Sequence, residues 1–258
     1  MENRPAHKKQ TANAFGNRAN SYLSSKIHRE GDDLDILANW SRGSRLALDI
    51  ATGAGHTANA IFQKNSSRSR VIAIDISPKM THTALSAYPS LEVAVSDAES
   101  LPFHDDSFDT VVCRIAAHHF PKPRLFLEEV SRVSNSSSVF LFEDNVAPNT
   151  PFLNTFLNTV EKLRDPTHIQ SHTVDQWTNW IEEQGFNIES ATILKKDIPY
   201  IPWTTQSNTS KDNLTKLNEL FINAPPEAKT LFDIKITNGS VESFSNLKLL
   251  LKATRLNQ

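Results

Sequence analysis

Three aspartates and two glycines carry residue types and spacing that suit the binding of a small ligand. Asp49, Asp75 and Asp97 each lie at or just past the end of a short apolar run, and Gly53 and Gly55 follow the first of them. Glycine lets the backbone turn sharply and approach a bound group, because no Cβ stands in the way. Asp75 follows the glycine turn by about 20 residues, the separation at which a βαβ unit places a carboxylate against ribose hydroxyls. This pattern indicates a nucleoside-containing ligand.

Histidines supply the candidates for proton transfer. His118 and His119 follow the apolar run 110–114, and His28 lies in the N-terminal part of the chain. Histidine is the natural base near neutral pH, and the ligand side of a Rossmann-like sheet lies beyond its strand ends. A structural role, capping or packing the next helix, stays open for at least one of the adjacent pair.

The elements expected to position these residues alternate between strands and helices, the pattern of an α/β protein. Buried strands are predicted at 46–50, 71–75, 91–95 and 110–114, and helices at 57–64 and from Pro78 to about Tyr88, with Ser77 as the N-cap. Thr173 and Gln176 predict a capping box for a helix that Gly185 closes. A helix is also predicted over 20–40, with a possible break at Gly31.

Composition excludes several classes of function. The 258 residues are 38% hydrophobic, carry a formal net charge of −2 and have a pI near 6.5, which gives no electrostatic reason to expect a nucleic-acid partner. The single cysteine, Cys113, rules out disulfides within the chain and is expected to be a buried structural thiol. Residues 1–9 are polar without the apolar core of a signal peptide, and no stretch is long enough to span a bilayer, so we expect a cytoplasmic protein without membrane contact.

Four motifs stand in order along the chain: Leu48-Asp49-x-Ala51-x-Gly53-x-Gly55, Ile74-Asp75-x-Ser77, Asp97-Ala98-x-x-x-Leu101-Pro102-Phe103 with Ser107-Phe108-Asp109, and Glu143-Asp144-Asn145. Together they resemble the class I, Rossmann-like S-adenosylmethionine-dependent methyltransferases. The branch typified by the ubiquinone and menaquinone C-methyltransferases is the most similar, over about residues 15 to 190. The resemblance implies a three-layer α/β fold with a seven-stranded mixed sheet, helices on both faces and a small lid insertion.

The resemblance also implies S-adenosylmethionine as the cofactor and a role for ten residues. Asp49, Ala51, Gly53 and Gly55 would surround its methionine part, Asp75 and Ile76 its ribose, Met80 the nucleoside, Asp97 and Ala98 the adenine, and Arg114 the carboxylate or sulfonium. A structural ion pair, for instance with Asp144, is the alternative for Arg114. Two departures from the family stand out: Ala51 replaces a usual glycine, where alanine keeps the turn provided that φ stays negative, and 134–137 replaces a glycine-containing turn.

The remaining chain is expected to select the methyl acceptor. We predict an N-terminal helical segment, 1–44, covering the active site, and a methyltransferase domain, 45–258, with substrate-side insertions at 149–172 and 199–240. Within these insertions and the N-terminal helix, Tyr22, Phe152, Tyr200 and Trp203 could line an apolar acceptor pocket, although buried aromatics more often belong to a core.

The sequence therefore predicts methyl transfer to a small molecule, by C- or O-methylation. A non-methylating S-adenosylmethionine-binding enzyme such as a cyclase is the first alternative, because the cofactor motifs would look the same. A nicotinamide-dependent oxidoreductase is the second, although its Tyr22-x-x-x-Lys26 pattern precedes the glycine turn instead of following it. No metal is expected, because the Asp144-Asn145 pair lacks a carboxylate between Arg114 and Phe120 to complete a magnesium site. A homodimer stays open.

Overall fold

The computed structural model describes residues 4–65 and 69–256, so part of the polar N-terminal stretch lies outside the described residues. The strands are β1 (Leu46–Ile50), β2 (Arg70–Asp75), β3 (Glu92–Val95), β4 (Phe108–Arg114), β5 (Ser134–Asn145), β6 (Phe186–Pro199), β7 (Lys235–Thr237) and β8 (Ser240–Arg255). The helices of the sheet layers are α4 (Asp32–Trp40), α5 (His56–Asn65), α6 (Pro78–Ala87), α7 (Pro123–Val133) and α9 (Val174–Glu183), with the short 3-10 helix η2 (Ala117–His119). The others are α1 (Arg4–Asn17), α2 (Ala19–Ser24), α3 (Lys26–Arg29), α8 (Pro151–Arg164), α10 (Tyr200–Gln206), α11 (Lys211–Ile222) and α12 (Pro226–Leu231).

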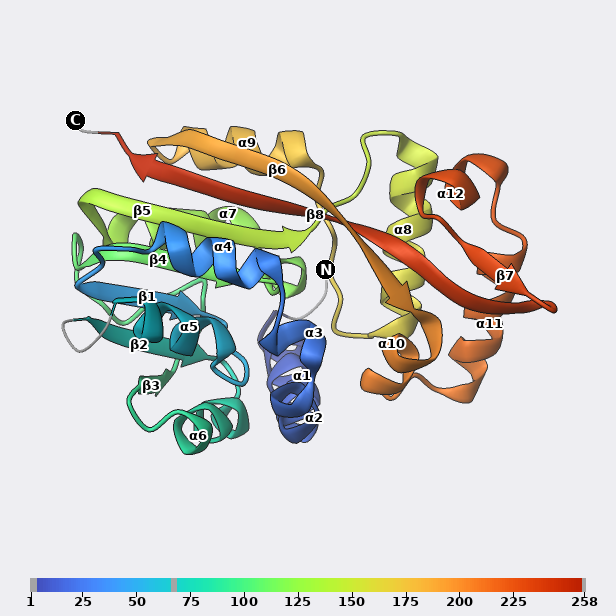
Figure 1. Ribbon diagram of the computed structural model, residues 1–258, viewed down its shortest axis with the longest axis horizontal. Helices are drawn as coiled ribbons and strands as arrows, with labels where there is room; N and C mark the ends of the chain where they lie inside the picture. Colours follow the sequence, from blue (N-terminus) through green and yellow to red (C-terminus); the bar gives the residue numbers. More distant parts are fainter. Residues whose placement is uncertain (1–3, 66–68, 257–258) are drawn as a thin grey trace.

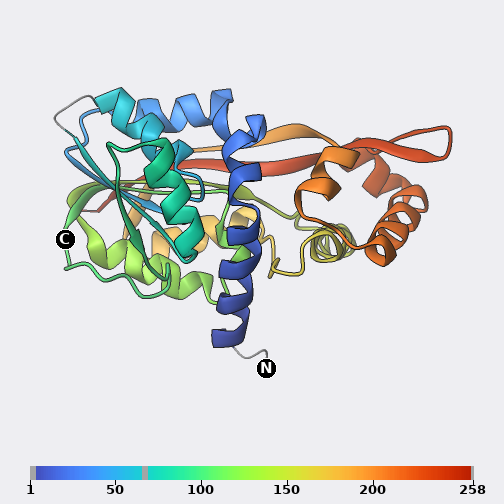
Figure 2. The ribbon, with the colours of Figure 1, turned by 90° about the horizontal axis from the view of Figure 1, so that it is seen from below.

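The sheet has the strand order β3-β2-β1-β4-β5-β8-β6, with β7 paired to β8. Strands β1 to β5 are parallel, and β8 runs antiparallel to both β5 and β6. Helices α4 and α5 cover one face, and α7 and α9 cover the other (Figure 2). The predicted three-layer fold is confirmed, and β7 adds an eighth strand to the seven of the continuous path.

The strand order brings the predicted ligand residues to one edge. The carboxyl ends of parallel strands meet at the same edge of a sheet, and ligands bind there, where the strand order reverses. In this sheet the reversal falls between β1 and β4, because β2 and β3 lie on one side of β1 and β4 on the other. Residues after β1, β2, β3 and β4 are therefore neighbours, although up to 70 positions separate them in the chain.

Local signals fixed some helix ends and not others. The predicted capping box is confirmed, because Thr173 Oγ1 accepts from the Gln176 N–H while the Gln176 side chain accepts from the Thr173 N–H. Pro78 begins α6 as predicted, but the Ser77 hydroxyl makes no cap and has no hydrogen-bond partner among the described residues. Residues 134–137 form no turn: β5 begins directly at Ser134, and its register with β4 shifts instead.

The N-terminal helix predicted over 20–40 is wrong in form. The chain makes α2, α3 and α4 there, and the backbone is extended at Ser25 and again at Glu30, before Gly31 adopts a φ of 148°. A further helix, α1, precedes them. Helices α1 and α2 pack against α6, and together with α3 they lie between α6 and α10 (Figure 1). The polar sequence of α1 carries no apolar stripe, so periodicity does not reveal this helix.

The two predicted insertions share a core of their own. Helices α8, α10, α11 and α12 gather around the distal half of β8, away from the parallel strands (Figure 1). Tyr200 and Trp203 are buried among Phe221, Phe244 and other side chains of this second core, with ring centroids 4.8 to 6.2 Å apart. The main core lies between the sheet and helices α7 and α9, with Trp177 and Phe186 fully buried. Cys113 is a free, buried thiol in that core, and burial raises its pKa well above the ordinary value.

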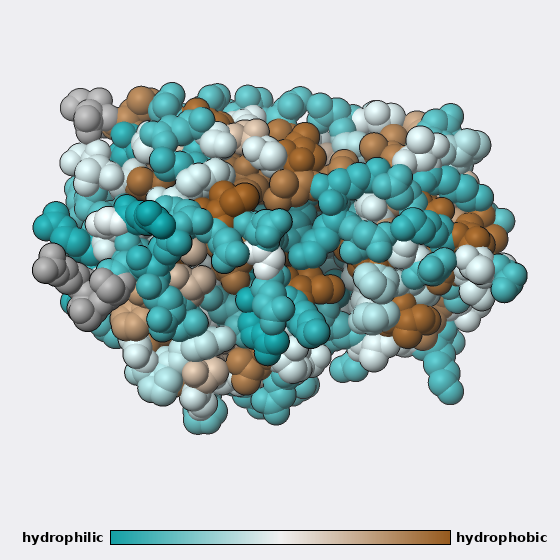
Figure 3. Space-filling model, in the orientation of Figure 1, coloured by the Kyte–Doolittle hydropathy of each residue, from teal (hydrophilic) through white to brown (hydrophobic). Residues whose placement is uncertain are grey.

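In the face drawn in Figure 3 hydrophilic side chains dominate, and apolar ones form small, separate groups. No helix within residues 4–65 and 69–256 is long and apolar enough to cross a membrane.

A buried charge cluster joins α4 to the sheet. Lys248 Nζ lies 3.1 Å from Asp33 and 2.6 Å from Glu143, and Arg114 bridges the same two carboxylates at 3.2 and 2.8 Å. All four side chains are less than one-tenth exposed. Burial raises the pKa of Glu143. Burial also opposes ionisation of Asp33, but its hydrogen bond with Glu143 and then the neighbouring cations hold the pKa of Asp33 below its ordinary range. Removing one partner of such a buried set leaves charge uncompensated.

Lys248→Met should therefore lower the free energy of unfolding by about 3 kcal/mol in urea denaturation. Lys252→Met is the matched control, because Lys252 pairs with Glu189 at a partly exposed position and should cost less than about 1 kcal/mol. Equal losses in the two variants would contradict a stabilising role for the cluster.

Candidate functional site

The loop after β1 is held from behind by Asp49. Its carboxylate accepts a hydrogen bond of 2.6 Å from the Thr52 hydroxyl, and the Thr52 N–H donates to the Ile74 carbonyl at 2.8 Å. Asp49 is 1% exposed, and burial raises its pKa to about 7. Asp49 does not line the cavity described below, so it acts on the loop and not at the cavity surface.

Backbone conformation in this loop differs from the expectation at Ala51. Its φ is +57°, beside +56° at Gly53, so the condition of a negative φ is not met at Ala51, and the turn is nevertheless kept. Alanine in this left-handed region costs about 1 kcal/mol relative to glycine, and the loop nevertheless adopts it. A Cβ on Gly53 would meet nothing within 4 Å, whereas one on Gly55 would lie 3.0 Å from Ala84 Cβ. Gly55 is therefore needed for packing against α6, and Gly53 opens to free space.

Asp75 joins two loops through one carboxylate. One oxygen accepts from the Gly53 N–H at 3.0 Å, and the other accepts from the Ser77 N–H at 2.8 Å. The residue is 8% exposed, and burial raises its pKa to about 6 while the two N–H donors oppose that shift. Each carboxylate oxygen keeps a second lone pair for a ligand hydroxyl.

Asp97 follows β3 and meets the N-terminal helix α1. Lys8 of α1 pairs with Asp97, and also with Glu99 at 2.7 Å. Asp97 Oδ1 accepts from the Glu99 N–H at 2.9 Å, which orients the carboxylate. The backbone N–H of Ala98 has no hydrogen-bond partner within the described part of the chain, so it can donate to a ligand.

A single cavity collects most of the predicted cofactor residues. It encloses about 890 Å³ of empty space, including the solvent at its mouth. Of the ten residues that the resemblance implied, eight line it: Ala51, Gly53, Asp75, Ile76, Met80, Asp97, Ala98 and Arg114. Asp49 and Gly55 do not.

Arg114 faces the cavity with its charge already compensated. Its guanidinium donates to Glu143, to Asp33 and to the carbonyl oxygen of His28 at 3.0 Å. The alternative of a structural ion pair is thus realised, with Glu143 and Asp33 in place of the predicted Asp144. Arg114 ties the α3–α4 segment to the end of β4.

The three candidate histidines fall in different places. His28 and His119 line the cavity, and His118 does not. The backbone N–H and the Nδ1 of His118 both contact the carboxylate of Asp144, at 2.7 and 2.6 Å. Burial lowers the pKa of His118, but the Asp144 carboxylate outweighs burial and raises that pKa above its ordinary value. His118 and Asp144 therefore fasten η2 to β5. Among the described residues no group of three or more metal-ligating side chains forms a candidate metal site.

An aromatic wall, formed by Phe15, Tyr22, His28 and His119, closes one side of the cavity. Ring centroids are 4.9 Å apart between Phe15 and His119, 5.6 Å between Phe15 and Tyr22, and 4.8 Å between Tyr22 and His28. Tyr22 is the one predicted acceptor residue that lines the cavity.

Tyr200 and Trp203 belong to the second core, and Phe152 is 46% exposed on α8, so the structure does not assemble the four-aromatic pocket predicted from sequence. Buried aromatics at helical spacing look the same in a sequence whether they line a core or a pocket.

Several cavity residues had no sequence signal of function. Thr11 and Phe15 come from α1, which lies in the predicted N-terminal helical segment 1–44, but no apolar periodicity singled out either residue. Ile115 lies directly after β4 at a φ of +54°, a rare conformation for a β-branched side chain, and its N–H donates to Glu143 O at 2.6 Å. Strained backbone of this kind gathers at functional sites.

Comparison with known proteins decides the family. Residues 48–142 match the model of a family described as "Methyltransferase domain". The chain is 31% identical to a Bacillus subtilis protein described as the uncharacterized methyltransferase YcgJ, over 93% of this chain and 97% of that one. The chain belongs to the class I S-adenosylmethionine-dependent methyltransferases. Its cofactor is S-adenosylmethionine.

Two further similarities concern the fold and the branch. The crystal structure of a methyltransferase from Bacillus halodurans, BH2331, superposes with a TM-score of 0.83 at 32% identity, covering 88% of this chain and all of that one. A demethylmenaquinone methyltransferase of Thermotoga maritima is 31% identical to this chain over an alignment that covers 40% of this chain and 44% of the Thermotoga protein. The family assignment also shows the oxidoreductase alternative to be wrong.

The cavity fits this cofactor. It presents carboxylates for hydroxyl and amino donors at Asp75 and Asp97, an N–H at Ala98 that is unpaired among residues 4–65 and 69–256, and free space in front of Gly53. No phosphate is present in S-adenosylmethionine, and accordingly the loop after β1 contributes no lysine or arginine to the cavity. The carboxylates of the lining come from Asp75 and Asp97, at the ends of β2 and β3.

Ala51→Gly should raise the free energy of unfolding by about 1 kcal/mol, because glycine relieves the left-handed backbone at this position. Ala54→Gly is the control in the same loop: its φ is not positive, so added chain entropy should lower stability by up to about 1 kcal/mol. Urea denaturation of both variants measures the difference. A loss of stability in Ala51→Gly would refute strain at Ala51.

Proposed function

We propose that this methyltransferase transfers the methyl group of S-adenosylmethionine to a small-molecule acceptor, by C- or O-methylation, within the cavity beneath α1. One observation carries the proposal: the same cavity joins cofactor-type carboxylates to an aromatic wall. Asp75 and Asp97 lie on the β2–β3 side of β1, and His119 lies on the β4 side. A cofactor seated on the carboxylates would extend past β1 toward the aromatic wall.

The residues of the cavity act by binding, orienting and excluding water. Asp75 would accept the ribose hydroxyls, Asp97 and Ala98 would hold the adenine, and Met80, 1% exposed, would pack against the nucleoside with Ile76. The bound cofactor supplies a methyl group whose carbon is electrophilic because it is bonded to a sulfonium. Transfer is an in-line displacement, so positioning and water exclusion supply most of the rate enhancement.

The N-terminal segment 1–44 would form the cover. Helix α1 contributes Thr11 and Phe15 to the cavity wall, and Lys8 and Arg18 anchor its two ends to Asp97 and Asp165. The largely apolar lining of the cavity favours a small, largely apolar acceptor over a nucleic acid. A cytoplasmic location remains our prediction.

Isothermal titration calorimetry with S-adenosylmethionine and with NAD tests the cofactor site. Asp75→Asn should weaken S-adenosylmethionine binding about 10- to 100-fold, because it removes a charged acceptor that two hydroxyls share. Asp212→Ala, at an exposed position of α11, is the control and should bind as the unaltered protein does. Unchanged affinity in Asp75→Asn would contradict the assignment of Asp75.

Binding should also depend on pH through Asp75. The ionised carboxylate accepts the hydroxyl protons, and burial raises its pKa to about 6, so the competent form is lost as pH falls below 6. Affinity for S-adenosylmethionine should fall about tenfold between pH 7 and pH 5, and Asp75→Asn should flatten that dependence. Tighter binding at pH 5 would have the wrong sign for this mechanism.

Turnover distinguishes methyl transfer from the cyclase alternative. With a panel of quinols, phenols and amines, formation of S-adenosylhomocysteine in step with methylated product supports the proposal. Conversion of an acceptor with no consumption of bound S-adenosylmethionine supports a cyclase.

A further inference from the structure

Of the two candidate histidines that line the cavity, His119 has a fixed tautomer and His28 does not. The Nδ1 of His119 lies 3.0 Å from the carbonyl oxygen of Thr167. A carbonyl oxygen can only accept, so Nδ1 must carry the proton and donate it. The lone pair of the ring is then on Nε2. His28 is not restricted in this way, because its Nδ1 contacts the Ser25 hydroxyl, which can either donate or accept.

Nε2 of His119 is the ring atom left for a ligand. The imidazole lines the cavity and packs edge-on against Phe15. Nε2 has no hydrogen-bond partner in the described part of the chain and is not among its fully buried polar atoms. A neutral ring with a free lone pair is a hydrogen-bond acceptor and a base.

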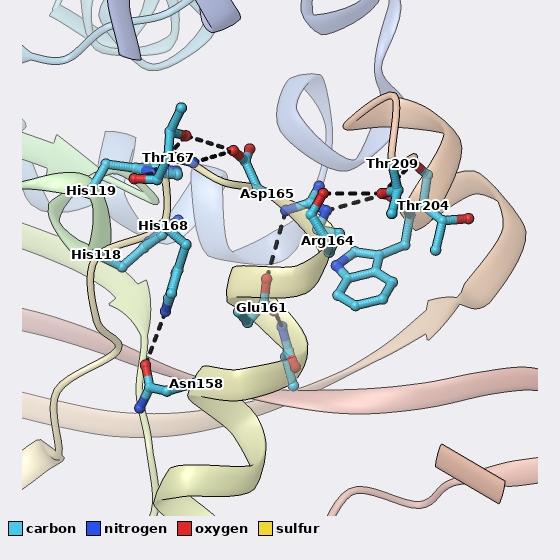
Figure 4. Close-up of polar contacts among 12 residues, drawn as sticks. His118, His119, Asn158, Glu161, Arg164, Asp165, Thr167, His168, Thr204 and Thr209 are labelled. Carbon is cyan, nitrogen blue, oxygen red and sulfur yellow. Dashed lines mark hydrogen bonds and ion pairs between the residues drawn. The ribbon is translucent and has the colours of Figure 1, made fainter. Parts of the chain in front are cut away.

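The groups around His119 keep it neutral and hold its orientation (Figure 4). Burial and the neighbouring ring of His118, 4.2 Å away between centroids, hold the pKa of His119 well below its ordinary value, and Arg164 acts in the same direction. The ring centroid of His168 lies 6.4 Å from that of His119. Burial and then the two neighbouring histidines lower the pKa of His168 to about 2. Asp165 is the opposing group, since its carboxylate favours protonation of His119.

Asp165 also fixes the carbonyl that orients the ring. Its Oδ1 accepts from the Thr167 N–H at 2.9 Å and from the Thr167 hydroxyl at 2.6 Å, and its Oδ2 accepts from Arg18 at 3.1 Å. Arg18 and Asp165 are 5% and 2% exposed. Because Arg18 lies between α1 and α2, closure of the N-terminal segment and the placement of His119 depend on the same carboxylate.

We propose that His119 Nε2 is the proton acceptor in methyl transfer and that the acceptor substrate is a weakly acidic hydroxyl compound, a phenol or an enol, held against the aromatic wall. This rests on the proposed function. In the step, the hydroxyl O–H bond breaks and its proton passes to Nε2. The freed electron pair forms the new O–CH3 bond as the C–S bond breaks toward sulfur, which leaves a neutral thioether and an imidazolium. Asp165, through Thr167, is a positioning residue that stabilises this imidazolium.

Ring-labelled ¹⁵N NMR of the full chain with bound S-adenosylhomocysteine tests the tautomer without turnover. His119 should show a protonated Nδ1 and an unprotonated Nε2, and at pH 6.5, the ordinary imidazole midpoint, it should remain neutral. Loss of the signal in His119→Gln assigns it. Arg18→Gln should raise the pKa of His119, because the charge of Asp165 is then less compensated. A proton on Nε2, or half-protonation at pH 6.5, overturns the proposal.

Equilibrium binding of 4-nitrophenol to the S-adenosylhomocysteine complex tests the acceptor class. His119→Leu should weaken 4-nitrophenol binding about tenfold, since one hydrogen bond to a buried acceptor is lost, with unchanged affinity for S-adenosylhomocysteine. His119→Gln, which keeps an acceptor, should lose less. His82→Leu is the control, because His82 is exposed on α6.

The titration separates failure of the His119 assignment from failure of the proposed function. No binding of 4-nitrophenol to the complex, or equal binding in His119→Leu, overturns the assignment of His119 and the hydroxyl acceptor. Failure of S-adenosylhomocysteine itself to bind contradicts the proposed function instead, so the two failures are distinguishable.

Discussion

The carboxylate of Asp75 holds together the two loops on which the cavity depends. It accepts from Gly53 after β1 and from Ser77 after β2, and it is nearly buried while doing so. A buried carboxylate is costly unless donors satisfy it, and here the backbone supplies two donors. The left-handed turn at Ala51 and Gly53 aims the Gly53 N–H at that carboxylate. The conformational cost at Ala51 is thus offset by a hydrogen bond that also shapes the cofactor cavity.

The N-terminal segment depends on charges supplied by the rest of the chain. Lys8 pairs with Asp97 and Glu99 at one end of α1, Arg18 pairs with Asp165 at the other, and Arg114 donates to the carbonyl of His28 in α3. Asp97 is therefore shared between Lys8 and the expected adenine contact. Under the proposed function, cofactor binding and the seating of α1 would use the same carboxylate, which would link the cover of the cavity to its occupancy.

The sequence predicted the part of the site that rests on local pattern. Asp75, Asp97 and Gly53 follow apolar runs or a turn, and parallel strands bring such residues to one edge. The other features of the site could not be predicted, because they depend on contacts between residues that are distant in the sequence. Arg114 was open between cofactor and ion pair, and only the fold reveals Asp33 and Glu143 as its partners. Helix α1 has no apolar stripe, and Tyr200 and Trp203 look alike in sequence whether they line a pocket or fill a second core.

Hydrogen–deuterium exchange with and without S-adenosylhomocysteine tests most directly the claim that the cofactor lies in the cavity beneath α1. The account predicts slower exchange on binding in four separate segments at once: 51–57, 75–80, 96–99 and α1. Protection confined to other segments, or protection of the three loops with unchanged exchange in α1, would contradict it.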